Sequence, residues 1–478
     1  MIQQLNMVKK ILTITSAILF IILMMQQQYI HAHMSGKWIE LKPTGIPPTG
    51  NVYHSAAAVG ETLYICGGYK NHNHTHYYDM NTNQWFEEPD AALFHNALAA
   101  DMDEVGGVLY LFGGKDTTSG KADGKGYVND LYAYKTGREN MIWEKIQTAK
   151  QPLERDGHAT TTLKGFVFMF GGWDETKYLN DLHVFDTTKL VATGTGGINV
   201  ISWSELTTVP NTPLPPVRNS HSMVTIGSSL LVYGGFTHDV QNAGPWVDCG
   251  KAEHGCTIYD DLWSLNVPGK LNYNTPNAQW TKLLPGGEDG KPEGRWEHDA
   301  ATIGDEMYLF GGLTAENEIL KDLWAYSKTR NIWRRLVDRE TGVFGHIMKP
   351  SSGSLYVFGG NKNIHRETTN ALWKFETILE EEEGEDGGGD EGIIPAGTIG
   401  DTDVCFKNKN GESMQTYVTM TFWILLIFFI SFIVFLCFFI KNGGGGNGNR
   451  SVGRKNSYLE LHTKNGSSND GEKPYTAL

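Results

Sequence analysis

The chain has 478 residues, of which 40% are hydrophobic and 11% aromatic, and glycine is in excess with 56 residues. This composition is typical of a globular protein, and the length allows one large β domain such as a propeller or barrel. The formal charge of −14 argues against a nucleic-acid-binding protein, because such a protein needs a basic face.

Residues 1–32 are predicted to form a secretory signal peptide. Lys9 and Lys10 precede the apolar run "ILTITSAILFIILMM", and Ala32 offers a small residue for cleavage. An uncleaved membrane anchor is the alternative, because the residues around Ala32 make a mediocre cleavage site.

Six similar segments follow within residues 33–376, and each contains an apolar strand that ends in two glycines. The strands read "LYICGG", "LYLFGG", "FVFMFGG", "LLVYGG", "MYLFGG" and "LYVFGG". Their glycine pairs are Gly67 and Gly68, Gly113 and Gly114, Gly171 and Gly172, Gly234 and Gly235, Gly311 and Gly312, and Gly359 and Gly360. Glycine at such a position lets the backbone turn sharply where other chains lie close.

Other positions recur around these glycine pairs. A histidine precedes each pair: His54, His95, His158, His221, His298 and His346. An aromatic strand such as "NDLYAY" follows each pair, and five copies then carry a tryptophan: Trp85, Trp143, Trp203, Trp280 and Trp333. Each unit therefore divides into four predicted strands, of which the first is rich in small residues and the second is apolar throughout.

This pattern resembles the kelch repeat over residues 36–376. The resemblance implies an all-β fold, a six-bladed propeller with one four-stranded blade per repeat. A seven-bladed propeller with a degenerate blade is the alternative. The sixth repeat stops after "TNALWKF", without a fourth strand or its tryptophan. We expect the N-terminal stretch "GKWIEL", with Trp38, to supply both and to close the ring, hiding two strand edges.

The recurring histidines and acidic residues are interpreted as packing positions rather than metal ligands, because residues related by a propeller axis lie too far apart for a shared metal. Asp130, Asp181, Asp261 and Asp322 are expected to fix turns or to pair with arginine. His72, His74 and His76 are a further metal candidate, although a polar loop is the preferred interpretation. Asn73 begins a glycosylation sequon.

Cys249 and Cys256 are expected to form a disulfide in a secreted domain, with a zinc half-site as the alternative. Cys405 is left over ahead of the second apolar run. The residues show neither the copper and Tyr–Cys set of galactose oxidase-like propellers nor the E-x3-D-x3-H iron motif of plant specifier proteins. We therefore predict no enzyme activity, no cofactor and no metal, with a galactose-oxidase-like enzyme of the secretory pathway as the alternative.

Three segments follow the repeats. Residues 377–416 form an acidic, glycine-rich linker, and residues 417–440 form an uncharged run that is long enough to cross a membrane core of about 30 Å as a helix. Residues 441–478 form a tail richer in Lys and Arg than in acids, which places the tail in the cytoplasm. Tyr458 to Leu461 and Tyr475 to Leu478 resemble sorting signals for clathrin adaptors, and the C-terminus resembles a PDZ ligand.

The predicted protein is thus a single-pass membrane protein of the plasma membrane or an endomembrane. Its propeller lies outside the cytoplasm and binds a protein or glycan in adhesion, as a receptor or in sorting. Binding is expected on the loops between the second and third strands of the blades, with Trp173 and Trp246 as partly exposed anchors. Packing of these tryptophans on neighbouring loops is the alternative.

Overall fold

The computed structural model describes residues 34–69, 74–88, 99–116, 126–137, 142–189, 200–239, 249, 251, 255–267, 278–287, 290–365 and 367–379. The chain divides into two compact units, Met1–Phe406 and Lys407–Leu478, and every described residue belongs to the first. Within the described part, no helix is long and apolar enough to cross a membrane. The expected signal peptide, membrane segment and tail lie outside it, as do Asn73, Trp246, Tyr458, Leu461, Tyr475 and Leu478.

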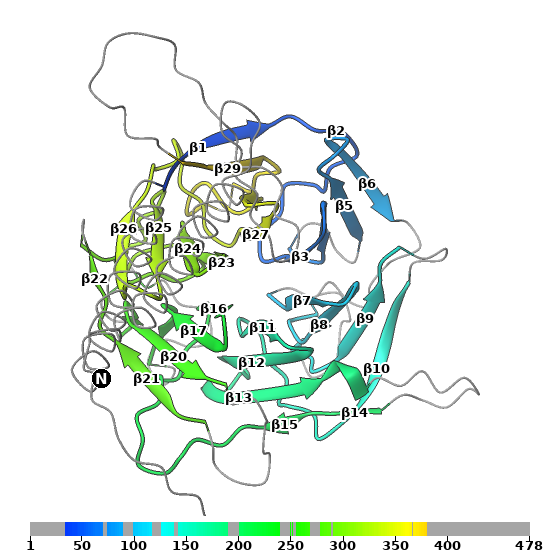
Figure 1. Cartoon of the computed structure of the whole chain (residues 1–478). Coiled ribbons are helices and arrows are strands. Elements are labelled where there is room, and N and C mark those ends of the chain that lie inside the picture. The colour runs from blue at the N-terminus through cyan, green and yellow to red at the C-terminus, as the bar shows by residue number, and fades with distance from the viewer. Residues whose placement is uncertain are drawn as a thin grey trace, which may run out of the picture. The chain divides into compact units, whose positions relative to one another are not determined.

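Six sheets stand around a central axis and form a six-bladed β-propeller (Figure 1). From the axis outward, blade 1 contains β3 (Ser55–Val59), β4 (Thr62–Cys66), β5 (Thr75–Asp79) and β6 (Gln84–Glu88). Blade 2 contains β7 (Asp101–Val105), β8 (Val108–Phe112), β9 (Leu131–Lys135) and β10 (Trp143–Ala149). Blade 3 contains β11 (Ala159–Leu163), β12 (Phe166–Trp173), β13 (Tyr178–Asp186) and β15 (Ser204–Glu205).

The other three blades repeat this plan. Blade 4 contains β16 (Ser222–Ile226), β17 (Ser229–Tyr233), β20 (Leu262–Asn266) and β21 (Trp280–Leu283). Blade 5 contains β23 (Asp299–Ile303), β24 (Glu306–Phe310), β25 (Leu323–Ser327) and β26 (Ile332–Arg335). Blade 6 contains β27 (Ile347–Ser351), β28 (Ser354–Phe358), β29 (Leu372–Leu379) and β1 (Met34–Leu41).

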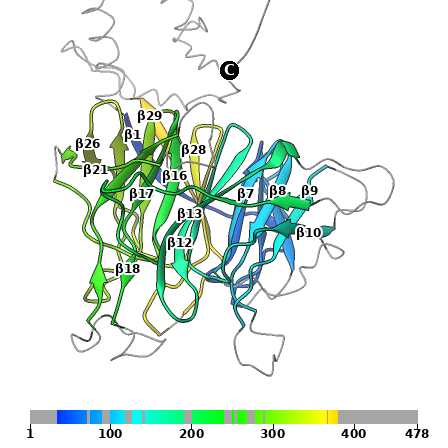
Figure 2. The same ribbon diagram turned by 90° about the horizontal axis from the view of Figure 1, so that it is seen from below.

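Short segments join neighbouring parts of the ring. β2 (Thr44–Gly45), β14 (Val200–Ser202) and β22 (Gly286–Gly287) pair in parallel with the outer strands β6, β10 and β26. β18 (Phe236–Thr237) and β19 (Thr257–Ile258) pair with each other and prolong blade 4 at one end (Figure 2), and one 3-10 turn covers Thr187–Lys189. The innermost strands contact each other in the closed order β3, β7, β11, β16, β23, β27 and back to β3.

The outer strand of blade 6 comes from the beginning of the described chain. β1 pairs antiparallel with β29, and Trp38 lies opposite Phe375. In the same register, Trp85 lies opposite Tyr78 and Trp333 opposite Tyr326. Trp38 therefore holds the tryptophan position of its blade. Its side chain is only half-buried, unlike the 1% exposed Trp85, and its indole Nε1 donates to the Val337 carbonyl at 2.9 Å.

The paired glycines and the histidines fit together between neighbouring blades. All twelve paired glycines have positive φ, between 64° and 103°, a backbone conformation that side chains disfavour. A Cβ atom on Gly171 would lie 2.8 Å from His221 Cε1 on the next blade. The position that packs in this way lies 13 residues before the glycine pair, and in blade 2 it is Ala100. His95 is therefore not the repeat residue of blade 2, and it lies outside the described residues.

Candidate functional site: the loop face of the propeller

The two ends of the propeller differ in their connections. We call loop face the end where the innermost strands begin and where the loops between second and third strands lie. The opposite end, with the tight hairpin turns, is the turn face. β18 and β19 extend blade 4 on the loop face.

A closed ring of six backbone hydrogen bonds surrounds the axis at the loop face. The residue just before each repeat position donates its N–H to the carbonyl of its counterpart on the preceding blade. The six bonds run from Ala99 to Tyr53, Gly157 to Ala99, Ser220 to Gly157, Glu297 to Ser220, Gly345 to Glu297 and Tyr53 to Gly345, with N to O distances of 2.8 to 3.1 Å. The ring ties all six blades together at one level.

All six residues of this ring have positive φ, between 53° and 61°. Glycine tolerates that conformation, but Tyr53, Ala99, Ser220 and Glu297 carry side chains and adopt it at a cost. Across the ring, the Tyr53 hydroxyl donates to the Glu297 carboxylate, with 3.0 Å to each oxygen. The mouth of the axis is thus framed by a strained backbone ring and one acidic side chain.

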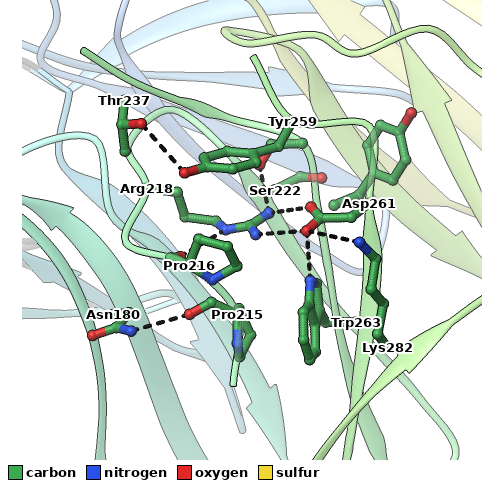
Figure 3. Close-up of polar contacts among 12 residues, drawn as sticks. Asn180, Pro215, Pro216, Arg218, Ser222, Thr237, Tyr259, Asp261, Trp263 and Lys282 are labelled. Atoms are coloured by element: carbon green, nitrogen blue, oxygen red, sulfur yellow. Dashed lines mark hydrogen bonds and ion pairs between the residues drawn. The ribbon is translucent and has the colours of Figure 1, made fainter. Parts of the chain in front are cut away.

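Buried arginine–aspartate pairs fix the starts of the third strands in blades 3 to 5. The pairs are Arg155 with Asp181, Arg218 with Asp261 and Arg295 with Asp322, at 2.6 to 2.9 Å. Each guanidinium also donates to the carbonyl of the first paired glycine of its blade (Figure 3 shows the surroundings of Arg218). Arginine beside each carboxylate, with hydrogen bonding, lowers the pKa of Asp261 and Asp322 despite their burial.

The fourth aspartate of this pattern is held differently. Asp130 accepts from the Lys145 ammonium at 2.7 Å and from the Tyr132 hydroxyl at 3.3 Å. Arginine pairing, one of the two roles expected for these aspartates, is therefore present in blades 3 to 5, whereas Lys145 is the cationic partner in blade 2.

Aromatic side chains from blades 2 to 6 cluster on the loop face. Tyr127, Trp173 and Tyr178 make one buried cluster, and Trp296, Leu313 and Phe344 make a second. Phe236 at the start of β18 packs against both clusters. The expected exposure of Trp173 is wrong, because the side chain is 4% exposed and packs on Tyr178 at 4.7 Å between ring centres.

Polar groups lie beside the first of these clusters. The Tyr178 hydroxyl and His238 Nδ1 share a short hydrogen bond. Burial raises the pKa of Asp156 to about 7, which the nearby Lys115 ammonium and Asn219 partly offset. Asp156 also pairs through its backbone with Trp173. A carboxyl group with a raised pKa therefore lies beside the aromatic cluster of Tyr127, Trp173 and Tyr178.

A disulfide joins Cys249 and Cys256 in the connection between β18 and β19, with 5.5 Å between the Cα atoms. The hydroxyls of Thr237 and Tyr259 lie 3.3 Å apart at the base of the same connection. The bridge closes a loop with a sequence separation of 7 within this connection.

Charged side chains line the axis below the ring. Asp101 accepts from the backbone N–H groups of Met102 and Thr160, and Asp299 accepts from those of Ala300 and Met348. Lys349 Nζ lies 3.9 Å from the Asp299 carboxylate. Burial acts to lower the pKa of Lys349, but Asp299, Asp101 and Asp103 together raise it above its usual value. This group was not predicted from the sequence, although Asp101 and Asp103 stand in a strand whose counterparts are rich in small residues.

The other predicted metal candidates have packing or surface roles. Burial lowers the pKa of the repeat histidines His54, His158 and His298 to about 3, so these rings are neutral. His74 is exposed and bonds to Glu87 at 2.7 Å, whereas His76 is buried. Nowhere in the described part of the chain do three His, Cys, Asp or Glu residues form a group that could hold a metal ion.

Comparisons with known proteins agree with this architecture. The KLHDC2/KLHL20/DRC7 Kelch-repeats domain matches residues 87–270, and the Kelch motif matches residues 51–91 and 297–338. Mouse Kelch domain-containing protein 1 is 26% identical over 349 residues, which cover 65% of this chain and 75% of that protein. Human Host cell factor 1 is 29% identical over 281 residues, but these cover 54% of this chain and only 12% of that protein.

A solved structure, that of YjhT, has the same fold. It superposes with a TM-score of 0.50 and 16% sequence identity, over 72% of this chain and 97% of that one. The family matches, the curated relatives and the six sheets around one axis agree on the repeat and on the architecture. The chain therefore belongs to the kelch-repeat proteins and folds as a six-bladed kelch propeller.

Proposed function

We propose that the loop face of the propeller is a binding surface for a protein partner. The observation that carries this proposal is the construction of that face, where two aromatic clusters and a disulfide lie beside a closed ring of backbone hydrogen bonds. Loops on a folded scaffold are the usual place for recognition, and a disulfide lowers the conformational freedom that is lost on binding. Kelch propellers generally bind protein partners, which supports the same role.

A pair of matched variants tests the face. Tyr69, just after a glycine pair on the loop face, is 48% exposed, and Ile142, which precedes β10 on the turn face, is 50% exposed. Tyr69→Ala should weaken capture of the partner by the full-length protein about tenfold, as for a contact near an interface centre, while Ile142→Ala should leave capture unchanged. Equal loss from both variants, or loss from Ile142→Ala alone, would place binding elsewhere.

Trp246 remains a predicted anchor of this surface, and it lies outside the described residues. Trp246→Ala is expected to weaken capture without changing secretion. Trp173→Ala should instead lower stability, because that side chain is buried. Digesting partner cells with protease or with glycosidases before capture would distinguish a protein from a glycan partner.

We also propose that the propeller stands outside the cytoplasm on a single membrane span. The proposal rests on the uncharged run 417–440 and on the basic tail that follows it. β29 starts at the loop face, where Leu372 pairs with Phe358, and runs toward the turn face. The chain therefore leaves the propeller at the turn face. The linker starts after Leu379 and not at Thr377, because β29 runs to Leu379, and it would span roughly 35 Å as a flexible coil.

Glycosylation tests this topology. Peptide-N-glycosidase should shift the protein by one glycan, and Asn73→Gln should abolish the shift, because Asn449 and Asn465 are placed in the cytoplasm. A shift that survives Asn73→Gln would mean that the orientation is inverted. The proposed role is binding and not catalysis, and copper or iron at one atom per purified chain would contradict that part.

A further inference from the structure

Blade 6 departs from the arginine–aspartate pattern of blades 3 to 5. The arginine position, three residues before the repeat histidine, is Val343, and the aspartate position is Ala371. The first paired glycine confirms the second equivalence, since Gly359 N donates to the Ala371 carbonyl as Gly311 N does to that of Asp322.

A different arginine nevertheless reaches the place that the repeat arginine side chain occupies in blades 3 to 5. Arg339 is 3% exposed, and its Nε donates to the Thr341 carbonyl at 2.7 Å. Thr341 lies five residues before the repeat histidine. In blades 3 to 5, the arginine Nε donates to the carbonyl at this same position, which belongs to Leu153, Pro216 and Glu293. The Arg339 guanidinium therefore donates to the carbonyl at the same repeat position as the arginines of blades 3 to 5 do.

The aromatic neighbours agree with this placement. In blade 5, Arg295 and the Tyr233 hydroxyl share the Glu293 carbonyl, and Arg295 and the Trp324 indole share the Asp322 carboxylate. Phe310 and Trp373 hold the positions of Tyr233 and Trp324 in the next blade. The Arg339 guanidinium lies 5.0 Å from the centre of the Phe310 ring and 5.1 Å from that of Trp373.

The carboxylate that completes this arrangement in the other blades is missing here. Among the described residues, the two terminal nitrogens of Arg339 and the Trp373 indole nitrogen have no hydrogen-bond or ion-pair partner. Glu40 on β1 favours the charged form of Arg339, but its carboxylate is bound to Lys42 at 2.6 Å. Burial lowers the pKa of Arg339 to about 10, so the guanidinium stays charged at neutral pH.

We propose that Arg339 and Trp373 form a carboxylate-binding site between blades 5 and 6, in which a carboxylate from a bound molecule takes the place that Asp322 fills in blade 5. The guanidinium offers two parallel N–H donors and the indole offers a third, a geometry that suits a carboxylate better than a spherical anion. Arg295 is fully buried while the Asp322 side chain is 11% exposed, so the place that a carboxylate would take beside Arg339 is expected on the solvent side of the arginine.

The source of the carboxylate is either a free small acid or a glutamate or aspartate of a bound protein. The site lies at the start of a third strand, toward the loop face, but it does not depend on the proposed function, because acetate alone is a sufficient probe. If Tyr69→Ala did not affect capture of the partner, the proposed function would fail, but the proposal of a carboxylate-binding site would not.

Thermal unfolding of the full-length chain at pH 7.5 and constant ionic strength tests the proposal. Replacing chloride by acetate should raise the Tm by about 2 °C once acetate exceeds its Kd. Ala371→Asp, which supplies the carboxylate from within, should raise the Tm without ligand and abolish the acetate effect. Ala371→Asn is the matched control without charge and should keep no more than a small part of the stabilisation.

Two further variants and one further probe complete the design. Arg339→Met should abolish the acetate effect, and Glu40→Gln should leave it intact or strengthen it. Acetyl-glutamate amide is the probe for a protein source: half-saturation at a lower concentration than for acetate assigns the site to a protein side chain, and the reverse order assigns it to a free acid. An equal Tm rise in wild type and Ala371→Asp, or none in wild type with either probe, would overturn the proposal.

Discussion

Arg218 shows how a single residue holds the start of a strand in this propeller. Its guanidinium binds both oxygens of Asp261 and the Gly234 carbonyl, and neither partner of the ion pair is exposed by more than 6%. Arg218→Met leaves the carboxylate buried without its partner, so we expect a loss of about 3–5 kcal/mol in the free energy of unfolding.

Urea unfolding measures this loss in the free energy of unfolding. The size of the loss should depend on pH, because the ion pair needs an ionised Asp261. Arg218 lowers the pKa of Asp261 in the folded protein, so the stability from the pair is present above the unfolded pKa and is lost as pH falls through the folded pKa. The deficit of Arg218→Met should therefore shrink in acid. Lys282→Met, which removes an exposed ammonium 4.0 Å from the same carboxylate, should change stability by less than about 0.5 kcal/mol.

Ala99 is a residue whose backbone conformation works against its side chain. Its φ is 53°, and its N–H and carbonyl both belong to the ring of six hydrogen bonds. Ala99→Gly keeps both bonds and removes the strain, so we expect a gain of about 1 kcal/mol in urea unfolding. Ala301→Gly, in the strand β23, should instead lose about 1 kcal/mol. A loss at both positions would show that the ring carries no strain at Ala99.

The ring of six hydrogen bonds could not be predicted from the sequence, unlike the paired glycines. The paired glycines stand out in the sequence because the same residue recurs at every copy. The six ring residues include Tyr53, Ala99, Ser220 and Glu297, which share no side-chain chemistry, since the ring is built from backbone groups alone. Arg339 was also hidden, because its guanidinium reaches the repeat position from another place in the chain. Residues that recur in every repeat could thus be predicted from the sequence. The backbone hydrogen-bond ring could not, and neither could Arg339, which replaces the repeat arginine from a different position in the chain.

At the scale of elements, β1 gives blade 6 its fourth strand. Its eight residues pair with β29, and Trp38 packs on Phe310 and Phe375 with ring centres 4.8 and 5.2 Å apart. Trp38→Ala should cost less than Trp85→Ala, for which burial predicts a loss of about 3–5 kcal/mol. Deleting Gly36 to Leu41 should cost more than Trp38→Ala, because the backbone bonds to β29 are lost too. A truncated chain that is secreted and melts like the full one would refute this role of β1.

The strand plan of the blades was predictable for physical reasons that apply element by element. β4, β8, β17, β24 and β28 are buried on both faces, which gives the continuous apolar runs read in the sequence. β18 and β19 were not predicted, because two-residue strands have no periodicity to detect. The burial of Trp173 was missed because its cover comes from Tyr127, Tyr178 and Phe236, on three different blades.

For the molecule as a whole, the axis is where all six blades meet and where charge is concentrated. Asp101 and Asp103 enter from blade 2, Asp299 from blade 5 and Lys349 from blade 6. Three carboxyl groups thus share one ammonium near the axis. Burial, together with the neighbouring Asp101 carboxylate, raises the pKa of Asp103 to about 7.

This raised pKa predicts how the stability of the whole propeller depends on pH. Between about pH 4 and pH 7, the folded protein keeps the Asp103 proton that the unfolded chain has lost, so stability falls as pH rises through this window and stays low above it. Asp103→Asn removes the ionisation, and its free energy of unfolding should exceed that of wild type by on the order of 1–3 kcal/mol at pH 8. At pH 4 the two should be nearly equal, which makes acid the internal control. The pKa of Asp299 is raised as well, so the stability of the variant should still fall as pH rises, but less steeply than that of the wild type because Asp103 no longer contributes. Urea unfolding at closely spaced pH values measures the difference, and a gap that stays constant from pH 4 to pH 8 would mean that Asp103 is ionised throughout and that Lys349 alone neutralises it.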